Sequence, residues 1–354
     1  MKIAIVNKHR NDDLGGSELQ CDFIADELQK RGHDVNYIAP GGQQNNYNKP
    51  YKVLPCKENS LSIVQSVLNI SPDVVYWRFN KIFFLESVKE LKRNNIPIIF
   101  AASHIKDLKA WVFNDGRNYR DKLKNIFTHR NEHKGFKYVD AITVNNKEFL
   151  SRVSFKHKKF VPNGMIEDYV PFTWENPYCV WVANIKYRKR PELYVKAAKE
   201  FEGKGLDFLM IGDIHQSSYG WIDDKKSNPS NFYYLGPRTI KEVNGVLKNS
   251  EFHIHTCTPE GFPNIFIQAW LQKKATITYS YDPSNLIRDK GLGFYSEGNW
   301  NKFTEQINFL VNNKKEREVL GKNAYNFASN TFKIQKSVDS LLELIEEVQL
   351  LESY

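Results

Sequence analysis

The chain has 354 residues, more than one ordinary hydrophobic core organises, so we expect two domains. Hydrophobic residues make up 41% of it and aromatic residues 14%, which can fill two cores, and the formal net charge of +9 admits a phosphorylated ligand, nucleic acid or an anionic membrane surface as a partner. The four cysteines are scattered with no C-x-x-C spacing, which argues against a disulfide framework or a zinc site and for a reducing compartment.

The first half of the chain alternates strand-like and helix-like segments. Its opening run, KIAIV, is far shorter than a signal-peptide core, and no window approaches 18 uninterrupted apolar residues, so we expect a cytoplasmic protein without a transmembrane helix. The pattern predicts strands at 2–6, 34–39, 73–79, 97–103 and 140–146, with helices at 17–32, 60–70 and 83–95. Residues 104–138 are irregular and basic. The alternation predicts a parallel sheet with helices on both faces.

Prolines and turn residues then interrupt the rhythm at 160–177, after which it restarts. The second half predicts strands at 178–185, 207–212, 231–236, 252–257 and 275–280, with helices at 190–202, 239–250, from about residue 264, 300–313, 316–330 and 332–353. We therefore expect an α/β fold with two doubly wound domains. The N-terminal one covers 1–165 together with the helix 333–354, the linker is 166–177, and the C-terminal one covers 178–332.

The first connection between a strand and a helix holds Gly15 and Gly16 just before Ser17. Glycines let the backbone approach a ligand closely, and a helix N-terminus presents free N–H groups, so this turn suits a phosphate or a sugar. It is neither a dinucleotide-binding G-x-G-x-x-G pattern nor a Walker loop. A tight turn capped by Ser17 is an equally good interpretation.

Two further groups follow predicted strands. His104 comes after PIIFAAS, where side chains face the ligand crevice of a parallel sheet, although a lone histidine is more often structural. Residues 184–192, NIKYRKRPE, place four basic residues between a strand and a helix that starts at Pro191. They predict an anion site, with a solvated charge run as the alternative.

The corresponding connection of the second domain reads CTPEGFPNIFIQAW, residues 257–270. A helix beginning near Asn264 would point the amides of Asn264 and Ile265 toward an anion. Glu260 would stand in the crevice and accept hydrogen bonds from ligand hydroxyls. Gln268 lies one turn after Asn264 on the same helix face. A capped core helix would leave Glu260 without an explanation.

Taken together, these segments resemble glycosyltransferase family 4, the retaining nucleotide-sugar glycosyltransferases with two Rossmann-like domains facing across a cleft, the GT-B fold. The second-domain motifs are specific and the N-terminal ones moderately so, and the resemblance runs in order over almost the whole chain. The resembling segments are GGSELQCDFIADELQKRGHDV (15–35), VANIKYRKRPEL (182–193), NPSNFYYLGPRTIKEVNGVLKNSEFHIHTC (228–257), EGFPNIFIQAW (260–270) and DPSNLIRDKGLGFYSEG (282–298).

The resemblance implies roles for individual residues. Glu260 would hold the hydroxyls of the transferred sugar, Lys189 would bind the diphosphate, and His104 would lie close to the transferred sugar. The implied donor-binding residues are Gly15, Gly16, Asn184, Arg188, Arg238, Gly261, Phe262, Pro263, Asn264, Ile265 and Gln268, with backbone amides of 262–265 serving the sugar and phosphates.

Two positions depart from the family pattern. Asn184 stands where an arginine is expected, which removes one charge from the diphosphate site unless Arg188 or Arg190 supplies it. Gln268 stands where the second glutamate is expected, so a ribose hydroxyl would lose a charge-assisted hydrogen bond.

The resemblance implies transfer of a hexosyl or N-acetylhexosaminyl group from a nucleotide-diphosphate sugar, foremost a UDP-sugar, to a glycan, lipid-linked or polymer acceptor in cell-surface polysaccharide or glycoconjugate synthesis. It implies no further cofactor and no metal, because Lys189, its neighbouring arginines and a helix N-terminus would stabilise the leaving diphosphate. A nucleotide-sugar 2-epimerase, a phosphorylase or synthase of the same fold, and a basic nucleic-acid-binding protein are the alternatives. No nucleic-acid recognition module is present, so we expect no nucleic-acid partner.

Residues 104–138 contain nine Lys or Arg against four Asp or Glu, with aromatic residues between them. Such a segment can rest on an anionic membrane or hold a phosphate-bearing acceptor, and a solvated face with a few core aromatics is an equal alternative. A cytoplasmic protein with peripheral contact at the inner face of the membrane fits the first interpretation.

Overall fold

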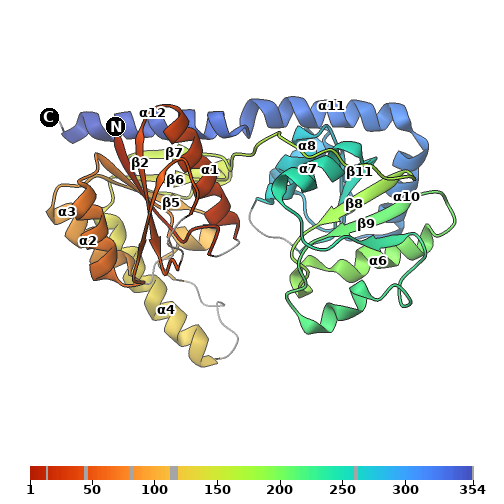
Figure 1. The fold of residues 1–354 in the computed structure, drawn as a ribbon, viewed down its shortest axis with the longest axis horizontal. Helices are drawn as coiled ribbons and strands as arrows, with labels where there is room; N and C mark the ends of the chain where they lie inside the picture. Colours follow the sequence, from red (N-terminus) through yellow and green to blue (C-terminus); the bar gives the residue numbers. More distant parts are fainter. Residues whose placement is uncertain (13–14, 44–46, 80–82, 112–118, 259–261, 353–354) are drawn as a thin grey trace. The chain divides into compact units, whose positions relative to one another are not determined.

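The computed structural model of the chain describes residues 1–12, 15–43, 47–79, 83–111, 119–258 and 262–352. The chain divides into two compact units. Unit 1 combines Met1–Gly164 with Ile334–Tyr354, and unit 2 is Met165–Lys333. Each unit is a parallel sheet with helices packed around it (Figure 1), which confirms the predicted class of two doubly wound α/β domains.

Within the described part of unit 1, seven parallel strands form one sheet in the order β3-β2-β1-β4-β5-β6-β7. The strands are β1 (Lys2–Val6), β2 (Asp34–Pro40), β3 (Lys52–Cys56), β4 (Val74–Trp77), β5 (Ile98–Ala102), β6 (Ala141–Val144) and β7 (Lys158–Phe160). The α-helices are α1 (Gly16–Lys30), α2 (Ser60–Ile70), α3 (Phe84–Arg93), α4 (Tyr119–His133), α5 (Lys147–Leu150) and α12 (Ile334–Glu352), with short 3-10 turns at η1 (Ile105–Leu108) and η2 (Lys134–Tyr138).

The central strands of unit 1 are apolar throughout because helices cover both faces of the sheet. Ile3 of β1 lies between Val35 of β2 and Val74 of β4, and all three side chains are buried. The helical end of the chain joins this unit, as expected. Arg31, the C-cap residue of α1, pairs with Asp339 of α12 at 2.7 Å, so charges at the rim reinforce the buried apolar stripe of that helix.

In the described part of unit 2, six parallel strands follow the order β10-β9-β8-β11-β12-β13. The strands are β8 (Tyr178–Val182), β9 (Asp207–Ile211), β10 (Phe232–Tyr234), β11 (Phe252–His255), β12 (Thr276–Thr278) and β13 (Gly293–Tyr295). The helices are α6 (Pro191–Glu200), α7 (Ile240–Asn249), α8 (Asn264–Leu271), α9 (Leu286–Asp289), α10 (Trp300–Asn312) and α11 (Lys314–Thr331), with 3-10 turns at η3 (Tyr187–Lys189), η4 (Ser217–Asp223) and η5 (Pro283–Asn285).

Residues 166–177, the expected linker, pack along α7 of unit 2. The side-chain amide of Asn244 donates to the carbonyl oxygens of Ile166 at 3.1 Å and Asp168 at 2.8 Å. The indole N–H of Trp174 donates to the Asp207 carboxylate at 2.8 Å. This segment satisfies its backbone polar groups through unit 2, and the chain passes between the units at Gly164–Met165 and Lys333–Ile334.

The structure adds elements that the sequence pattern did not predict. Three of them, β3, β7 and β13, are edge strands, and the fourth edge strand of the two sheets, β10, was predicted. Residues 104–138, expected to be irregular, contain α4 and two 3-10 turns. Among the described residues, no helix is both long enough and apolar enough to cross a lipid bilayer.

Candidate functional site

The ligand-facing edge of unit 2 centres on the neighbouring strands β8 and β11. The sheet continues from β8 to β9 on one side and from β11 to β12 on the other, so the chain leaves these two strands in opposite directions. Such a point of reversal opens a crevice beyond the carboxyl ends of the strands, which is where open α/β sheets bind ligands.

Two threonines connect the segments that follow these strands. The hydroxyl of Thr256 donates to the carbonyl oxygens of Lys189 at 2.9 Å and Arg190 at 3.0 Å, and it accepts from the indole of Trp181 at 2.9 Å. The backbone N–H of Thr258 donates to the carbonyl oxygen of Arg188 at 2.9 Å, and its hydroxyl does so at 3.1 Å. The structure thus brings the basic segment against the segment that leads into α8, two motifs that the sequence had offered as separate candidates.

The basic segment is a tight, well-defined turn. The backbone N–H of Lys189 donates to the carbonyl oxygen of Lys186, the N-cap residue of η3. Arg190 adopts a left-handed conformation with φ 51° immediately before Pro191 starts α6. The Arg190 guanidinium lies 5.0 Å from the centre of the Tyr279 ring. Arg188 is exposed, while Lys189 and Arg190 are half-buried. Several cations therefore gather on a short, fixed backbone, which is the arrangement that binds a multiply charged anion.

Helix α8 begins at Asn264, as predicted. Its N-cap residue is Pro263, which has no polar side chain to cap the helix, and its first turn carries no acidic residue. The positive end of such a helix favours a bound anion. The side chain of Phe262 packs against Phe332 and Trp270, with ring centres 5.0 and 6.1 Å apart, so it anchors the turn in the core. Glu260 and Gly261 lie outside the described residues.

Gln268 is a buried polar group on α8. Its side chain is 8% exposed, and its Oε1 atom makes no hydrogen bond to any of the described residues. A buried acceptor without a partner costs free energy, because it loses its hydrogen bonds to water. A ligand donor such as a hydroxyl would satisfy it.

The connections after β9 and β10 border the same edge of the sheet. Gly212 follows β9 with φ 154°, and a Cβ there would overlap the carbonyl oxygen of Ala183, so only glycine allows the backbone before Asn184 to pass so closely. Gly212 N–H donates to the carbonyl oxygen of Gly236 at 3.2 Å. Asn184 and Arg238 are both exposed at this edge.

In unit 1, the order of strands reverses between β1 and β4. Helix α1 starts at Gly16 with Gly15 as its N-cap, so Ser17 is not the cap, and the Ser17 hydroxyl accepts from the side-chain amide of Asn7 at 3.0 Å. The Glu18 carboxylate lies against Gly15. This helix N-terminus therefore already holds a carboxylate, which would repel a phosphate at the same place.

His104 caps the 3-10 turn after β5. Its Nδ1 accepts from the backbone N–H of Lys106 at 3.0 Å, and the backbone N–H of His104 donates to the Asp107 carboxylate at 2.8 Å. In the neutral imidazole, the proton is then on Nε2. The predicted position at a strand end thus combines with a structural role in the turn.

Arg78 is a further candidate that the sequence reasoning missed. It follows β4, and its guanidinium donates to the Ser103 hydroxyl and the Asn163 side-chain oxygen, both at 3.1 Å. A cation at the carboxyl end of a central strand next to the point of reversal is positioned for an anionic ligand. The sequence did carry a signal for Arg78, because it stands near the end of the predicted strand DVVYWRF (73–79), where side chains face the ligand crevice.

The described residues contain no group of three His, Cys, Asp or Glu side chains that could hold a metal ion. Metal independence stays a prediction, to be tested with a chelator.

Residues 171–327 match the family model described as glycosyl transferases group 1. A protein of Methanocaldococcus jannaschii described as an uncharacterized glycosyltransferase is 26% identical over 165 residues, which are 46% of this chain and 45% of that protein. The match thus spans less than half the length of this relative.

Solved structures share the fold over nearly the whole chain. The Anabaena protein Alr3699/HepE, determined with UDP and glucose, is 14% identical, has a TM-score of 0.74, and matches 98% of this chain and 100% of its own. A glycosyltransferase from Rickettsia africae is 15% identical with a TM-score of 0.75, and 98% of each chain is covered. Sucrose-phosphate synthase from Thermosynechococcus elongatus is 14% identical with a TM-score of 0.74, and both chains are covered in full.

At these identities the structures establish the fold alone, and it is the fold of GT-B glycosyltransferases. Within it, the match to the group 1 glycosyl transferases covers residues 171–327, the part of unit 2 that holds the basic segment, Thr256 and α8.

Proposed function

We propose that this protein is a retaining glycosyltransferase of the family 4 type. It transfers a hexosyl or N-acetylhexosaminyl group from a nucleotide-diphosphate sugar, foremost a UDP-sugar, to a glycan, lipid-linked or polymer acceptor in cell-surface polysaccharide or glycoconjugate synthesis. The match of residues 171–327 to group 1 glycosyl transferases and the UDP and glucose in the Anabaena structure support the donor class. The alternatives, a nucleotide-sugar 2-epimerase or a nucleic-acid-binding protein, gain no support from these similarities.

One observation carries the proposal for the donor. Thr256 and Thr258 hold the carbonyl groups of residues 188–190, so the cations of that turn are fixed beside the segment that leads to the uncapped N-terminus of α8. In this proposal Lys189 and Arg188 bind the diphosphate, Gln268 accepts from a ribose hydroxyl, and Glu260 holds hydroxyls of the sugar. Arg238 and the turn at Gly236 border the base.

In this proposal the transfer of the sugar depends on stabilisation of the departing nucleoside diphosphate, and no protein nucleophile is needed. Cations and helix amides that are already oriented cost little reorganisation when negative charge develops on the leaving oxygen. In the front-face scheme that the resemblance implies, a leaving phosphate oxygen takes the proton of the acceptor hydroxyl. His104, Gly15 and Gly16 are proposed to contact the transferred sugar.

A panel of UDP-, GDP-, ADP- and dTDP-sugars in a thermal-shift assay, followed by measurement of transfer, tests the function. A donor present at 100 times its Kd should stabilise the protein by about 2.7 kcal/mol.

Glu260→Gln should abolish transfer, and Lys189→Ala should weaken donor binding about tenfold to a hundredfold through loss of a charge-assisted contact. Lys226→Ala removes an exposed cation from a loop of unit 2 and serves as the control. Near wild-type turnover of both site variants at saturating donor contradicts the assignment, and release of a free sugar epimer from the donor alone favours the epimerase.

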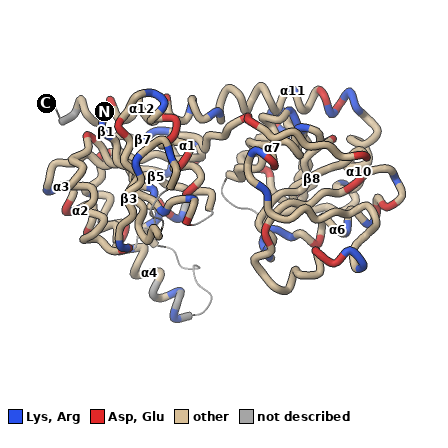
Figure 2. The backbone as a smooth tube through the Cα atoms, in the orientation of Figure 1, with Lys and Arg blue, Asp and Glu red and all other residues tan. Residues whose placement is uncertain are grey.

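We also propose that α4 and Trp111 rest on an anionic membrane, where a lipid-linked acceptor would be found. Leu123 and Phe127 lie one turn apart on α4 and are 41% and 64% exposed. Trp111 is 46% exposed, and the Arg130 guanidinium lies 5.0 Å from the centre of its ring. Lys and Arg positions along α4 are drawn in blue in Figure 2. Exposed apolar side chains flanked by cations are typical of a helix that lies in a membrane interface.

A further inference from the structure

A polar cavity opens at the carboxyl ends of β1, β2 and β3 in unit 1. Its volume is about 390 Å³, within the range of roughly 300–1,000 Å³ that is usual for small-molecule sites. The lining side chains that matter for binding are Lys8, Asn11, Asp12, Gln43 and Glu58. The cavity lies at the ligand-facing edge of the sheet, on the loop that leads from β1 toward Gly15.

The turn after β2 allows the wall of the cavity to form. Gly41 has φ 75°, and a Cβ at this position would stand 3.0 Å from the Oε2 atom of Glu58. Its backbone N–H bonds to the carbonyl oxygen of Cys56 at 2.8 Å. The left-handed conformation favours glycine. The Glu58 carboxylate lies beside this turn, with its Oε2 atom 3.6 Å from Nζ of Lys8.

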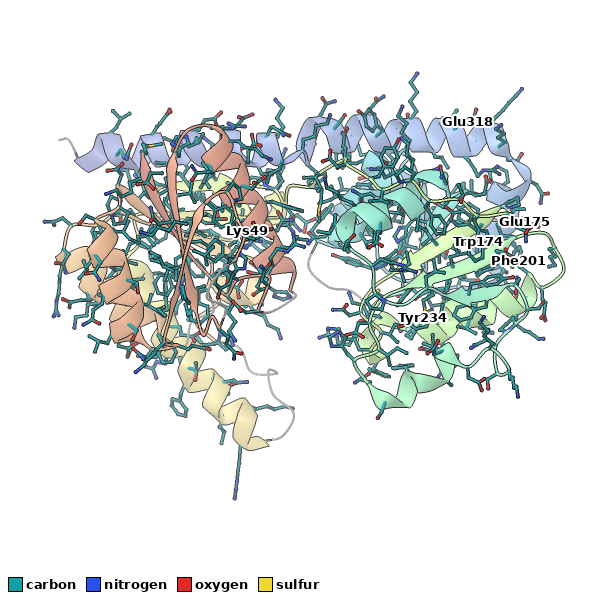
Figure 3. The ribbon with its side chains drawn as sticks, viewed as in Figure 1. Lys49, Trp174, Glu175, Phe201, Tyr234 and Glu318 are labelled. Carbon is teal, nitrogen blue, oxygen red and sulfur yellow. The ribbon has the colours of Figure 1, made fainter. Side chains whose placement is uncertain are left out.

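A buried charged network supports the opposite wall. The Asp22 carboxylate on α1, 4% exposed, pairs with Arg10 at 3.0 Å and Lys49 at 2.6 Å, and it accepts from the Tyr51 hydroxyl. Lys49 lies among the side chains that fill unit 1 (Figure 3). The Nε2 atom of His9 lies 3.1 Å from the Tyr51 hydroxyl, and burial lowers the pKa of His9 to about 4, so the ring is neutral at pH 7.

This network fixes the residues that face the cavity. The neutral His9 ring accepts at Nδ1 from the backbone N–H of Asn11 at 3.2 Å, and the carbonyl oxygen of His9 accepts from the N–H of Asp12 at 2.9 Å. The Tyr47 hydroxyl donates to the Asp12 carboxylate at 2.8 Å. Buried ion pairs contribute little net stability after the cost of desolvation. A network of them beside a cavity at a ligand edge is better explained by holding Asn11 and Asp12 in one orientation.

The charge of the lining selects among ligands. Two carboxylates, Asp12 and Glu58, face one ammonium group, Lys8, so the wall has a net negative charge. Carboxylates accept hydrogen bonds from hydroxyl groups, and the amides of Asn11 and Gln43 can donate and accept. A phosphate or carboxylate ligand would be repelled by this wall, whereas a neutral sugar with many hydroxyls would match it.

We propose that this cavity binds an uncharged sugar unit and that it is the acceptor subsite of the transferase. The sugar's hydroxyl groups donate to Asp12 and Glu58 and accept from Lys8 and the amide of Asn11. The assignment as the acceptor subsite rests on the proposed function, whereas the proposal that the cavity binds a sugar rests on the cavity itself.

Saturation-transfer NMR on the full chain tests the proposal. The probes are the methyl glycosides of glucose, galactose, mannose and N-acetylglucosamine, each compared with the 6-phosphate of the same sugar. At least one neutral glycoside should give a saturable signal, with the phosphorylated sugars binding more weakly. Asp12→Asn and Glu58→Gln should each reduce the affinity at least about fivefold, the difference between a charge-assisted and a neutral hydrogen bond. Glu90→Gln, an exposed carboxylate on α3 paired with Arg93, is the matched control and should bind as wild type.

The same samples are titrated with UDP and with UDP-glucose, which separates the two proposals. Binding of nucleotide without binding of any neutral glycoside overturns the cavity assignment and leaves the transferase proposal standing. Binding of a neutral glycoside by a protein that binds no nucleotide sugar overturns the transferase and leaves the cavity. Stronger binding of phosphorylated sugars, or unchanged affinity in both variants, overturns the proposed selectivity for uncharged sugars. Glu58 is partly exposed, so its variant stays informative if Asp12→Asn disturbs the loop.

Discussion

The hydroxyl of Thr256 holds the carbonyl oxygen of Lys189 at 2.9 Å, across 67 residues of sequence. The same hydroxyl accepts from the buried indole of Trp181, so a single oxygen joins the core of unit 2 to the turn that carries the cations. The position of Lys189 therefore depends on a residue that carries no charge.

Thr256→Val should reduce the free energy of unfolding of unit 2 by about 1–3 kcal/mol, because valine keeps the shape but removes the acceptor of the buried Trp181 indole and the donor to the carbonyl groups of Lys189 and Arg190. Donor binding should weaken as well, since the turn loses its tether. Urea unfolding and a UDP titration measure the two effects. Thr304→Val on α10, where the hydroxyl bonds only to its own helix, should change stability by less than about 0.5 kcal/mol. Equal effects of the two variants would show that Thr256 does not hold the turn.

Gln268→Glu alone should fail to improve use of the donor. A carboxylate would accept more strongly from a ribose hydroxyl, but it would be buried and would repel the diphosphate. Asn184→Arg supplies the charge that offsets this repulsion, so the double variant should recover donor kcat/KM. A double-mutant cycle on donor kcat/KM measures the coupling. Strictly additive effects would show that the two positions act independently.

Transfer should survive EDTA, because in the proposed site Lys189, Arg188 and the amides of α8 supply the positive charge. Rates with and without excess chelator, at saturating donor, make the measurement. A complete loss of turnover that manganese restores would require a metal in the mechanism.

Replacing the exposed apolar residues of α4 should release the protein from anionic vesicles. The variant Leu123→Ser/Phe127→Ser should bind phosphatidylglycerol-containing vesicles at least about tenfold more weakly, since each buried apolar side chain contributes about 1.5–3 kcal/mol. Sedimentation at low and high salt measures the binding. Leu61→Ser on α2, where the leucine is 68% exposed, is the control and should leave binding unchanged. Wild-type protein that shows no salt-sensitive binding at all would rule out the membrane contact.

Stability should fall between about pH 6.5 and pH 4 because of His9. Burial lowers its pKa in the folded protein to about 4, whereas an unfolded histidine titrates near 6.5. In this window the unfolded chain binds the additional proton, so acidification favours unfolding by up to about 3 kcal/mol. The neighbouring charges oppose one another, with Asp22 and Asp12 raising the pKa and Lys49 and Arg10 lowering it.

His9→Gln removes the titrating ring and should lose stability less steeply than wild type over the same range. Asp22 acts in the same direction but at lower pH, since its pKa in the folded protein is below the usual value. Burial raises this pKa, and the hydrogen bonds from Lys49, Tyr51 and Arg10 together with the charge of Lys49 lower it by more. Thermal melting at pH 7, 6 and 5 compares the slopes. Parallel slopes in the two proteins would contradict a neutral, buried His9.

The order of strands and helices could be predicted because buried parallel strands are continuous apolar runs and their covering helices are amphipathic. KIAIV, VVYW and IIFAA are such runs, and Asn264 was recognised as the start of α8 from the prolines and glycine before it. The strands that escaped prediction, β3, β7 and β13, are three of the four edge strands, and the fourth, β10, was predicted from its aromatic run FYY. Edge strands are partly solvated, and the sequences of the three missed strands lack the continuous apolar signal.

By itself the sequence determined the two α/β domains, the helical end, and the basic segment and α8 as separate candidate motifs, because each depends on neighbouring residues and their periodicity. Only the tertiary structure decided that Thr256 and Thr258 hold residues 188–190, that Gln268 is buried with an unsatisfied oxygen, and that Asp22, His9 and Lys49 together support one cavity wall. Those relationships join residues far apart in the chain. They follow from which strands become neighbours in the sheet, and no local pattern records that choice.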